Sequence, residues 1–428
     1  MSSHHITRRS LLGAAFSLSA ATPQWIDLFD GRSLTGWTPN ENQTSWKVRD
    51  GELHADGPRC HLFYTGPKAD FKHFELEFEA NAAPAANSGL YFHTGFQEKG
   101  FPFKGFEVQV NNTAGGEGTY RERKRTGSLY GVRNVYKQIV ADNTWFTANV
   151  LVRGKNIQVR VDGMLVVDYT EPTPVYVPPG PERDRRLDHG TFALQCHDPG
   201  SKVRYRKVRV RPLADSVTAK DATEAPIVDD IFKAIIDLGR DNIPLVDFDV
   251  QTKTSNIPAL LKQARRDGFQ VGITCDSKSA AQYLKALRGQ LVFSGLRTTG
   301  GPVDRALAKQ FDYILADASL WTSADALLNN PIDVIANLPT ELQTNATLDA
   351  MAKNTLALQM NENNMTADFV NRAKQSGVKL SFGSGYNRTG PLKRCERGVA
   401  LAKECKLKWP DFWVAGAWGS TKAADRKG

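Results

Sequence analysis

The chain has 428 residues, of which 41% are hydrophobic and 24% are charged. This composition is ordinary for a folded protein of two or three domains, and it excludes a mainly disordered, collagen-like or disulfide-scaffold chain. The net charge of +9 is spread evenly, so the sequence has no basic arm that would indicate a nucleic-acid partner. All eight histidines precede residue 198, which confines imidazole chemistry to the first half.

The N-terminus carries an export pattern. Arg8 and Arg9 precede a short, mildly apolar run and small residues near Ala21, which is typical of a twin-arginine signal. We therefore predict that residues 1–23 are a signal peptide and that the mature protein is periplasmic or secreted. No other run reaches the roughly 18 apolar residues of a membrane span. The five cysteines form no Cys-x-x-Cys pair, and we expect them to be buried free thiols.

Residues 24–213 follow the period of β-strands. Apolar and polar residues alternate in Phe74–Glu79, Phe106–Val110 and Ile157–Val161. Turn signals separate these runs, and Asp162-Gly163 between two apolar segments is a strong hairpin signal. The pattern predicts an antiparallel all-β sandwich.

Five segments of this half occur in the order and spacing of a known family. They are Leu28–Trp37, Asn87–Phe92, Gly105–Val110, Thr126–Gly131 and Leu194–Asp198. Together they resemble the 3-keto-disaccharide hydrolase domain. The resemblance implies a concanavalin-like jelly-roll sandwich that acts on glycosides whose ring carries a ketone at C3. It also places Arg206 on an arginine of the family that could reach the site.

The alternation itself creates two polar strips. In Phe106–Val110 the apolar residues face one way, so Glu107 and Gln109 share the opposite surface. Gln195 and His197 likewise share a face of their strand. We predict that Glu107 and His197 are catalytic, because they are the titratable groups of these strips. The predicted substrate-binding residues are Asn87, Tyr91, His93, Gln109, Tyr130, Gln195 and Arg206, with Trp145 as a further apolar wall.

A ketone at C3 makes the C2 proton acidic, which opens an elimination route. A base such as Glu107 or His197 removes that proton, donors or a metal hold the enolate, and the C1 substituent leaves. Water then adds, so the net reaction is hydrolysis. Direct displacement by a carboxylate pair is the alternative route. The alternative function is a non-catalytic carbohydrate-binding protein. No cofactor is predicted for either function.

The second half has a different pattern of apolar residues. Residues 214–226 are polar and are predicted to be a linker. In residues 227–428, short apolar runs alternate with helical stretches about seven times, which predicts parallel strands in an α/β sheet or barrel. The expected strands are Leu245–Val250, Gln270–Cys275, Gln290–Leu296, Tyr313–Ala316, Asp333–Leu338, Thr355–Met360 and Lys379–Phe382; the expected helices include Pro258–Arg266, Ser277–Arg288, Val303–Gln310 and Ala367–Gln375.

The expected strand ends in this half resemble, more faintly, those of the polymerase and histidinol phosphatase (PHP) superfamily, a distorted (β/α)7 barrel with a metal cluster. The resemblance rests on Asp249-Val250-Gln251, Thr274-Cys275-Asp276, Gln359 and Gly385-Tyr386-Asn387. No histidine is available here, so we predict a degenerate PHP-like barrel without the family's metal cluster. Its strand-end residues could still line a ligand pocket around Asp249, Gln251, Gln359 and Asn387. Oxygen donors that could hold one divalent cation are Asp247, Asp249, Asp276 and Asp317.

Overall fold

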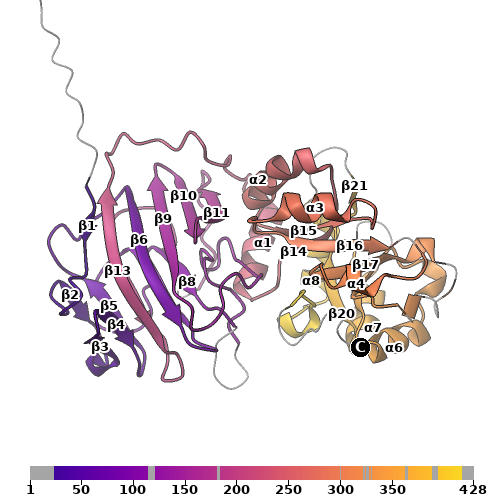
Figure 1. Cartoon of the computed structure of the whole chain (residues 1–428), viewed down its shortest axis with the longest axis horizontal. Coiled ribbons are helices and arrows are strands. Elements are labelled where there is room, and N and C mark those ends of the chain that lie inside the picture. Colours follow the sequence, from indigo (N-terminus) through magenta and orange to yellow (C-terminus); the bar gives the residue numbers. More distant parts are fainter. Residues whose placement is uncertain are drawn as a thin grey trace, which may run out of the picture.

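The chain forms a β-sandwich and an α/β barrel that lie side by side (Figure 1). The computed structural model describes residues 24–113, 121–180, 184–298, 300–321, 323, 327–328, 330–361, 365–387 and 394–416. The predicted signal peptide lies outside the described residues. The last strand of the sandwich ends at Pro212 and the first helix begins at Asp230, so residues 213–229 connect the two parts.

The described strands of the first half form two antiparallel sheets. The first sheet has the order β11-β10-β9-β6-β13-β4-β3, with β1 also paired to β13; the second has the order β2-β5-β12-β7-β8. The strands of the first sheet are β1 (Ile26–Asp27), β3 (Trp46–Arg49), β4 (Glu52–Ala55), β6 (Phe74–Ala82), β9 (Phe146–Arg153), β10 (Asn156–Val161), β11 (Met164–Thr170) and β13 (Val203–Pro212). Those of the second sheet are β2 (Trp37–Pro39), β5 (Cys60–Tyr64), β7 (Ser88–Thr94), β8 (Phe106–Val110) and β12 (Thr191–Cys196). The predicted all-β sandwich is confirmed.

Strand β6 shows why this half folds as a sandwich. Phe74, Leu76 and Phe78 are fully buried between the sheets. Burial of each such side chain contributes about 1.5–3 kcal/mol. The glutamates between them face outward, where Glu77 and Glu79 form ion pairs with arginines of the neighbouring β13. Strand β13 is therefore a sheet strand with a basic outer face, as its alternation predicts.

The second half is a closed barrel. Within the described chain, seven parallel strands pair in the order β15-β16-β17-β18-β19-β20-β14, and β14 also pairs with β15, which closes the ring. The strands are β14 (Val246–Gln251), β15 (Gln270–Cys275), β16 (Phe293–Thr298), β17 (Tyr313–Asp317), β18 (Val334–Ala336), β19 (Ala357–Met360) and β20 (Lys379–Phe382), and β21 (Tyr386–Asn387) adds to β14. The described helices are α1 (Asp230–Arg240), α2 (Ile257–Asp267), α3 (Ala280–Leu287), α4 (Arg305–Ala308), α6 (Asn345–Lys353), α7 (Ala367–Gln375) and α8 (Glu396–Glu404).

One tyrosine fills part of the barrel interior. The ring of Tyr313 occupies space that a Cβ at Gly272 or Gly295 would take, and its hydroxyl donates to the carbonyl oxygen of Phe248 at 2.8 Å. Burial raises the pKa of Tyr313 well above its ordinary value. The interior is thus a packed core rather than a channel at this level.

The strand ends of the barrel carry an ion-paired triad. The guanidinium of Arg297 on β16 bonds Asp249 and, at 2.5 Å, Asp317. Burial raises the pKa of Asp249 to about 7, although Arg297 acts in the opposite direction. Asp276, the third expected cation ligand, caps the turn at Ser279 instead. In the part of the chain that the structure describes, no three His, Cys, Asp or Glu side chains are grouped to hold a metal ion.

Two further expectations concern the whole chain. All five cysteines are buried and none of them forms a disulfide bond, as predicted. None of the described helices combines the length and the apolar character that a bilayer crossing requires.

Candidate functional site

A cavity of about 280 Å³ opens beside the second sheet of the sandwich. It brings together residues from β7, β8, β12 and the loops around them: Asn87, Tyr91, Phe101, Glu107, Gln109, Glu122, Tyr130, Gln195 and His197. The two predicted catalytic residues, Glu107 and His197, therefore line one cavity. So do the predicted binding residues Asn87, Tyr91, Gln109, Tyr130 and Gln195.

Strand register places Glu107 in the middle of the cavity wall. Tyr91 on β7 lies opposite Glu107 on β8, and Gly89 lies opposite Gln109. Gly89 is needed here because a Cβ would clash with the Glu107 side chain, lying 2.9 Å from its Cγ. The Glu107 carboxylate is 3.8 Å from the guanidinium of Arg185, and both side chains are almost fully buried.

Two glutamine side chains have buried carbonyl oxygens that can accept hydrogen bonds. The Nε2 of Gln109 donates to Oδ1 of Asn87 at 2.8 Å, and the Nε2 of Gln195 donates to the Tyr91 hydroxyl at 3.0 Å. The Oε1 atoms of Gln109 and Gln195 are buried and have no hydrogen-bond partner among the described residues. A buried amide oxygen without a partner is costly, so both positions suit a ligand hydroxyl or an ordered water.

His197 is oriented by its neighbour. Its Nδ1 lies 2.7 Å from Oδ2 of Asp198, and that carboxylate also accepts from the Ser201 hydroxyl and the Gly200 amide. A carboxylate accepts hydrogen bonds, so Nδ1 carries the proton and Nε2 is left as the basic atom. The imidazole packs against Phe101, whose ring centroid is 5.4 Å away.

His61 on β5 lies beside the cavity wall, with its ring centroid 5.5 Å from that of Tyr91. It is fully buried, and its Nε2 lies 3.5 Å from the Nε2 of Gln195. Burial, with smaller effects from Arg59 and His197, lowers the pKa of His61 to about 3. His61 is therefore a neutral imidazole. His61 was not predicted as a site residue. Its position opposite Gln195 on the neighbouring strand, which puts both side chains on one face of the sheet, is evident only once the pairing of β5 with β12 is known.

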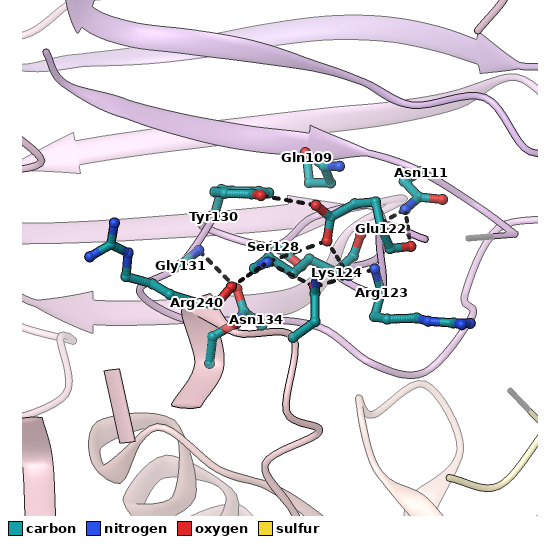
Figure 2. Close-up of polar contacts among 12 residues, drawn as sticks. Gln109, Asn111, Glu122, Arg123, Lys124, Ser128, Tyr130, Gly131, Asn134 and Arg240 are labelled. Atoms are coloured by element: carbon teal, nitrogen blue, oxygen red, sulfur yellow. Dashed lines mark hydrogen bonds and ion pairs between the residues drawn. The ribbon is translucent and has the colours of Figure 1, made fainter. Parts of the chain in front are cut away.

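The loop after β8 adds a second carboxylate that sequence reasoning missed. Figure 2 shows Glu122 between Tyr130 and Lys124: its Oε2 accepts from the Tyr130 hydroxyl at 2.9 Å, and its Oε1 accepts from the Lys124 backbone amide at 2.9 Å. Asn111 supports this loop, because its Nδ2 donates to the carbonyl oxygens of Glu122 and Lys124. Residues 121–125 read as a cluster of loop charges in the sequence, with no periodicity to indicate which one faces the cavity.

Two predicted binding residues do not reach the cavity. His93 was predicted to bind substrate, but its φ of 55° interrupts the regular alternation of β7. Its Nε2 hydrogen-bonds the carbonyl of Lys72, and its ring packs on Phe74. His93 is not among the residues that line the cavity.

Arg206 belongs to the other sheet. It lies on β13, where it bonds Glu79 at 2.5 Å and stacks over Trp145 at 4.0 Å. Neither Arg206 nor Trp145 is among the residues that line the cavity. The structure therefore places Arg206 on the first sheet, whereas the cavity lies beside the second sheet.

The described residues do not form an obvious metal centre at the cavity. Glu107, Glu122 and His197 come from separate elements, and within the described ranges no three metal-binding side chains are grouped. The chemistry that the residues present can supply is proton transfer, hydrogen bonding to hydroxyl groups and electrostatic stabilisation by Arg185.

The sandwich is similar to a known family of domains. Residues 24–211 match the model of the 3-keto-alpha-glucoside-1,2-lyase-like domain. The resemblance inferred from the five segments is thereby confirmed for the sandwich. The match does not extend to the barrel, and the PHP-like relationship stays a prediction. A search of curated proteins finds no significant match to the chain.

Solved structures similar to this chain include sugar-active and sugar-binding proteins. A candidate glycosyl hydrolase from Parabacteroides distasonis is 21% identical, with 44% of this chain and 94% of that chain covered and a TM-score of 0.38. The carbohydrate-binding module CBM66 from Bacillus subtilis is 14% identical, with 41% and 95% covered and a TM-score of 0.28. Similarity at this level does not indicate what the cavity of this chain binds.

Proposed function

We propose that the sandwich cleaves 3-keto-glycosides by removing the proton at C2. The observation that carries the proposal is that Glu107 and the His197–Asp198 pair line one cavity with the buried acceptors of Gln109 and Gln195. The match of this half to the 3-keto-alpha-glucoside-1,2-lyase-like domain supports both the substrate class and the elimination route.

In the proposed reaction, Nε2 of His197 takes the proton from C2 of the sugar. The electron pair of that C–H bond forms an enolate with the C3 ketone. The C1–O bond then breaks, the departing oxygen takes the proton held by His197, and a C1–C2 double bond remains next to the restored ketone. Water adds to C1 while Glu107 takes its proton, and Glu107 then delivers this proton to C2. The net result is hydrolysis.

The environment fits the charge that develops. Hydrogen-bond donors aimed at an enolate oxygen are worth more in a desolvated site than in water. The amide groups of Asn87 and Gln109 and the hydroxyl of Tyr91 are donors on the cavity wall. The guanidinium of Arg185 supplies positive charge behind Glu107. Phe101, which is 42% exposed at the rim, gives an apolar surface for the ring of the leaving sugar.

Direct displacement by a carboxylate pair is the second mechanism, since Glu107 and Glu122 both line the cavity. Glu122, however, is already engaged by Tyr130 and Lys124, so it is the less suitable nucleophile. Solvent deuterium separates the two mechanisms. Cleavage in D₂O places deuterium at C2 of the released 3-keto-hexose if the C2 proton is removed, and leaves C2 unlabelled if the bond is displaced directly.

The catalytic assignment is tested with E107Q and H197A, incubated with a 3-keto-disaccharide while free 3-keto-hexose is measured. We expect each substitution to lower kcat by about 10²–10⁴-fold. Matched controls are E77Q and H189A, which alter a glutamate and a histidine outside the cavity. Wild-type turnover in both E107Q and H197A would show that the catalytic assignment is wrong. Sugar binding without any turnover by the native protein would instead support the carbohydrate-binding alternative.

We also propose that the enzyme works in the periplasm or outside the cell. The support is the Arg8-Arg9 pattern ahead of a mildly apolar run. Cell fractionation of the native chain beside an R8K/R9K variant tests this proposal. Retention of the variant in the cytoplasm, with export of the parent, is the expected result.

A further inference from the structure

The segment from 121 to 137, here called the docking loop, lies between the cavity and the barrel. On its cavity side it extends the edge of β8: the Tyr130 amide donates to the Glu107 carbonyl at 2.9 Å, and the Gly127 amide donates to the Gln109 carbonyl at 2.9 Å. These two bonds set Glu122 and Tyr130 beside the predicted catalytic glutamate. The docking loop has no helix or strand of its own. Its position therefore depends on what holds its other side.

The other side of the docking loop is held by the barrel. Lys124, whose side chain is fully buried, donates from Nζ to the Arg240 carbonyl at 3.3 Å and to Oδ1 of Asn242 at 2.8 Å. Asn134 donates to the Gly239 carbonyl at 3.0 Å. Figure 2 shows these groups converging on the end of the helix that carries Arg240.

These contacts have a common physical basis. The last carbonyls of a helix have no partner within the helix, and the helix dipole favours a positive charge at that end. Lys124 meets this requirement at the carboxyl end of α1. Arg133 does the same for α2, because its Nε and Nη2 donate to the carbonyls of Arg265 and Arg266 at 2.9 and 2.6 Å. Two cations of the docking loop thus cap two helices of the barrel.

We infer that the barrel is a positioning element of the sandwich cavity, which acts through Lys124 and the docking loop. The same Lys124 that caps α1 lies 3.4 Å from the Glu122 carboxylate, and Glu122 holds the Tyr130 hydroxyl. A continuous path of polar contacts therefore runs from Asn242 of the barrel to the cavity wall. The activity part of this inference rests on the proposed function.

The contacts also show which end of the barrel is used. Tyr136 donates to the Ile243 carbonyl at 2.9 Å, and Lys137 donates to the Val292 carbonyl at 2.8 Å and pairs with Asp312. Ile243, Val292 and Asp312 precede β14, β16 and β17, so the docking loop binds the amino ends of the strands. In such barrels this end is the one associated with stability, whereas active sites form at the opposite end. The barrel therefore supports the sandwich site through the amino ends of its strands.

The test uses full-length N242G and N242D. Asn242 has a φ of 63°, which glycine adopts without strain. N242G therefore removes the side-chain oxygen that accepts from Lys124 at little cost to the backbone. Since a misplacement of about 1 Å near a reacting group can cost 10²-fold, we expect N242G to lower kcat by about 10–100-fold. N242D keeps an oxygen acceptor and should retain kcat within about threefold, a change below 1 kcal/mol. The matched control is Y176F, which lies outside the docking loop and removes another contact between the domains, the hydrogen bond from the Tyr176 hydroxyl to Asp237 at 3.0 Å; its kcat should stay at the wild-type value.

A second measurement does not require turnover. Hydrogen exchange of the Gly127 and Tyr130 amides reports whether the docking loop is held against β8. We expect faster exchange at both amides in N242G and wild-type exchange in N242D and Y176F. If the native protein cleaves no 3-keto-glycoside but this exchange pattern appears, the proposed function fails and the positioning role stands. Unchanged exchange in N242G, or loosened amides with undiminished kcat, would overturn the inference.

Discussion

The substitution G89A tests the position of Glu107 without changing Glu107 itself. Gly89 has no positive φ, so alanine fits its backbone. The new Cβ would lie 2.9 Å from Cγ and 3.0 Å from Cδ of Glu107, and closer still to Oε1. Since non-bonded atoms favour separations of about 3.5–4.0 Å, the carboxyl group must move by roughly 0.5–1 Å. A shift of that size at a reacting group can lower the rate by up to about 10²-fold.

The assay is steady-state release of 3-keto-hexose from a 3-keto-disaccharide, with thermal unfolding followed in parallel. We expect kcat to fall by about 10–100-fold in G89A. The control is G95A, because a Cβ at Gly95 meets nothing within 4 Å and its backbone is equally permissive. If G89A is folded and turns over like the parent while E107Q is inactive, the reasoning from the placement of the Glu107 carboxylate is wrong.

Three further outcomes are expected. D198N should lower kcat by at least about tenfold with little change in KM, because His197 loses the carboxylate that fixes its tautomer; an unchanged kcat would exclude an oriented imidazole. F101A should raise KM for a 3-keto-disaccharide but not for a methyl 3-keto-glycoside, which has no second ring to stack; equal effects on both would contradict the rim assignment. The pKa of His61 is lowered from 6.5 to about 3, so unfolding takes up a proton below pH 6.5 and the stability contributed by this group is lost as the pH falls toward 3. In H61Q the free energy of unfolding should decline less steeply between pH 6.5 and 4, by about 1 kcal/mol per pH unit, when measured with urea.

Much of the sandwich site was predictable because strand alternation is a strong geometric constraint. The period of two in β8 put Glu107 and Gln109 on one face, and the same logic applied to Gln195 and His197. His93 lies outside the cavity lining, and its positive φ is a local break that the sequence pattern does not reveal. Arg206 was expected at the site from the family resemblance, which does not tell which of the two sheets carries the strand of Arg206.

The alternation of apolar and polar residues could not have identified Glu122 as a site residue. Its carboxylate is fixed by Lys124 and Tyr130 in a segment without regular structure, and Lys124 is in turn held by residues more than a hundred positions away. Such a residue can be assigned to the site only when the tertiary contact between Lys124 and the barrel is known. In the barrel, by contrast, the short apolar runs located every strand of the closed ring to within a few residues, since buried parallel strands are apolar on both faces.

The triad of Asp249, Arg297 and Asp317 has a consequence for how this end of the barrel responds to its surroundings. Its positive charge is covalently part of the chain, so neither a chelator nor a scarcity of divalent ions in the medium can remove it. Protonation of Asp249 is one way in which the charge of this triad can change, and burial, which raises the pKa of that carboxyl to about 7, places this change near neutral pH.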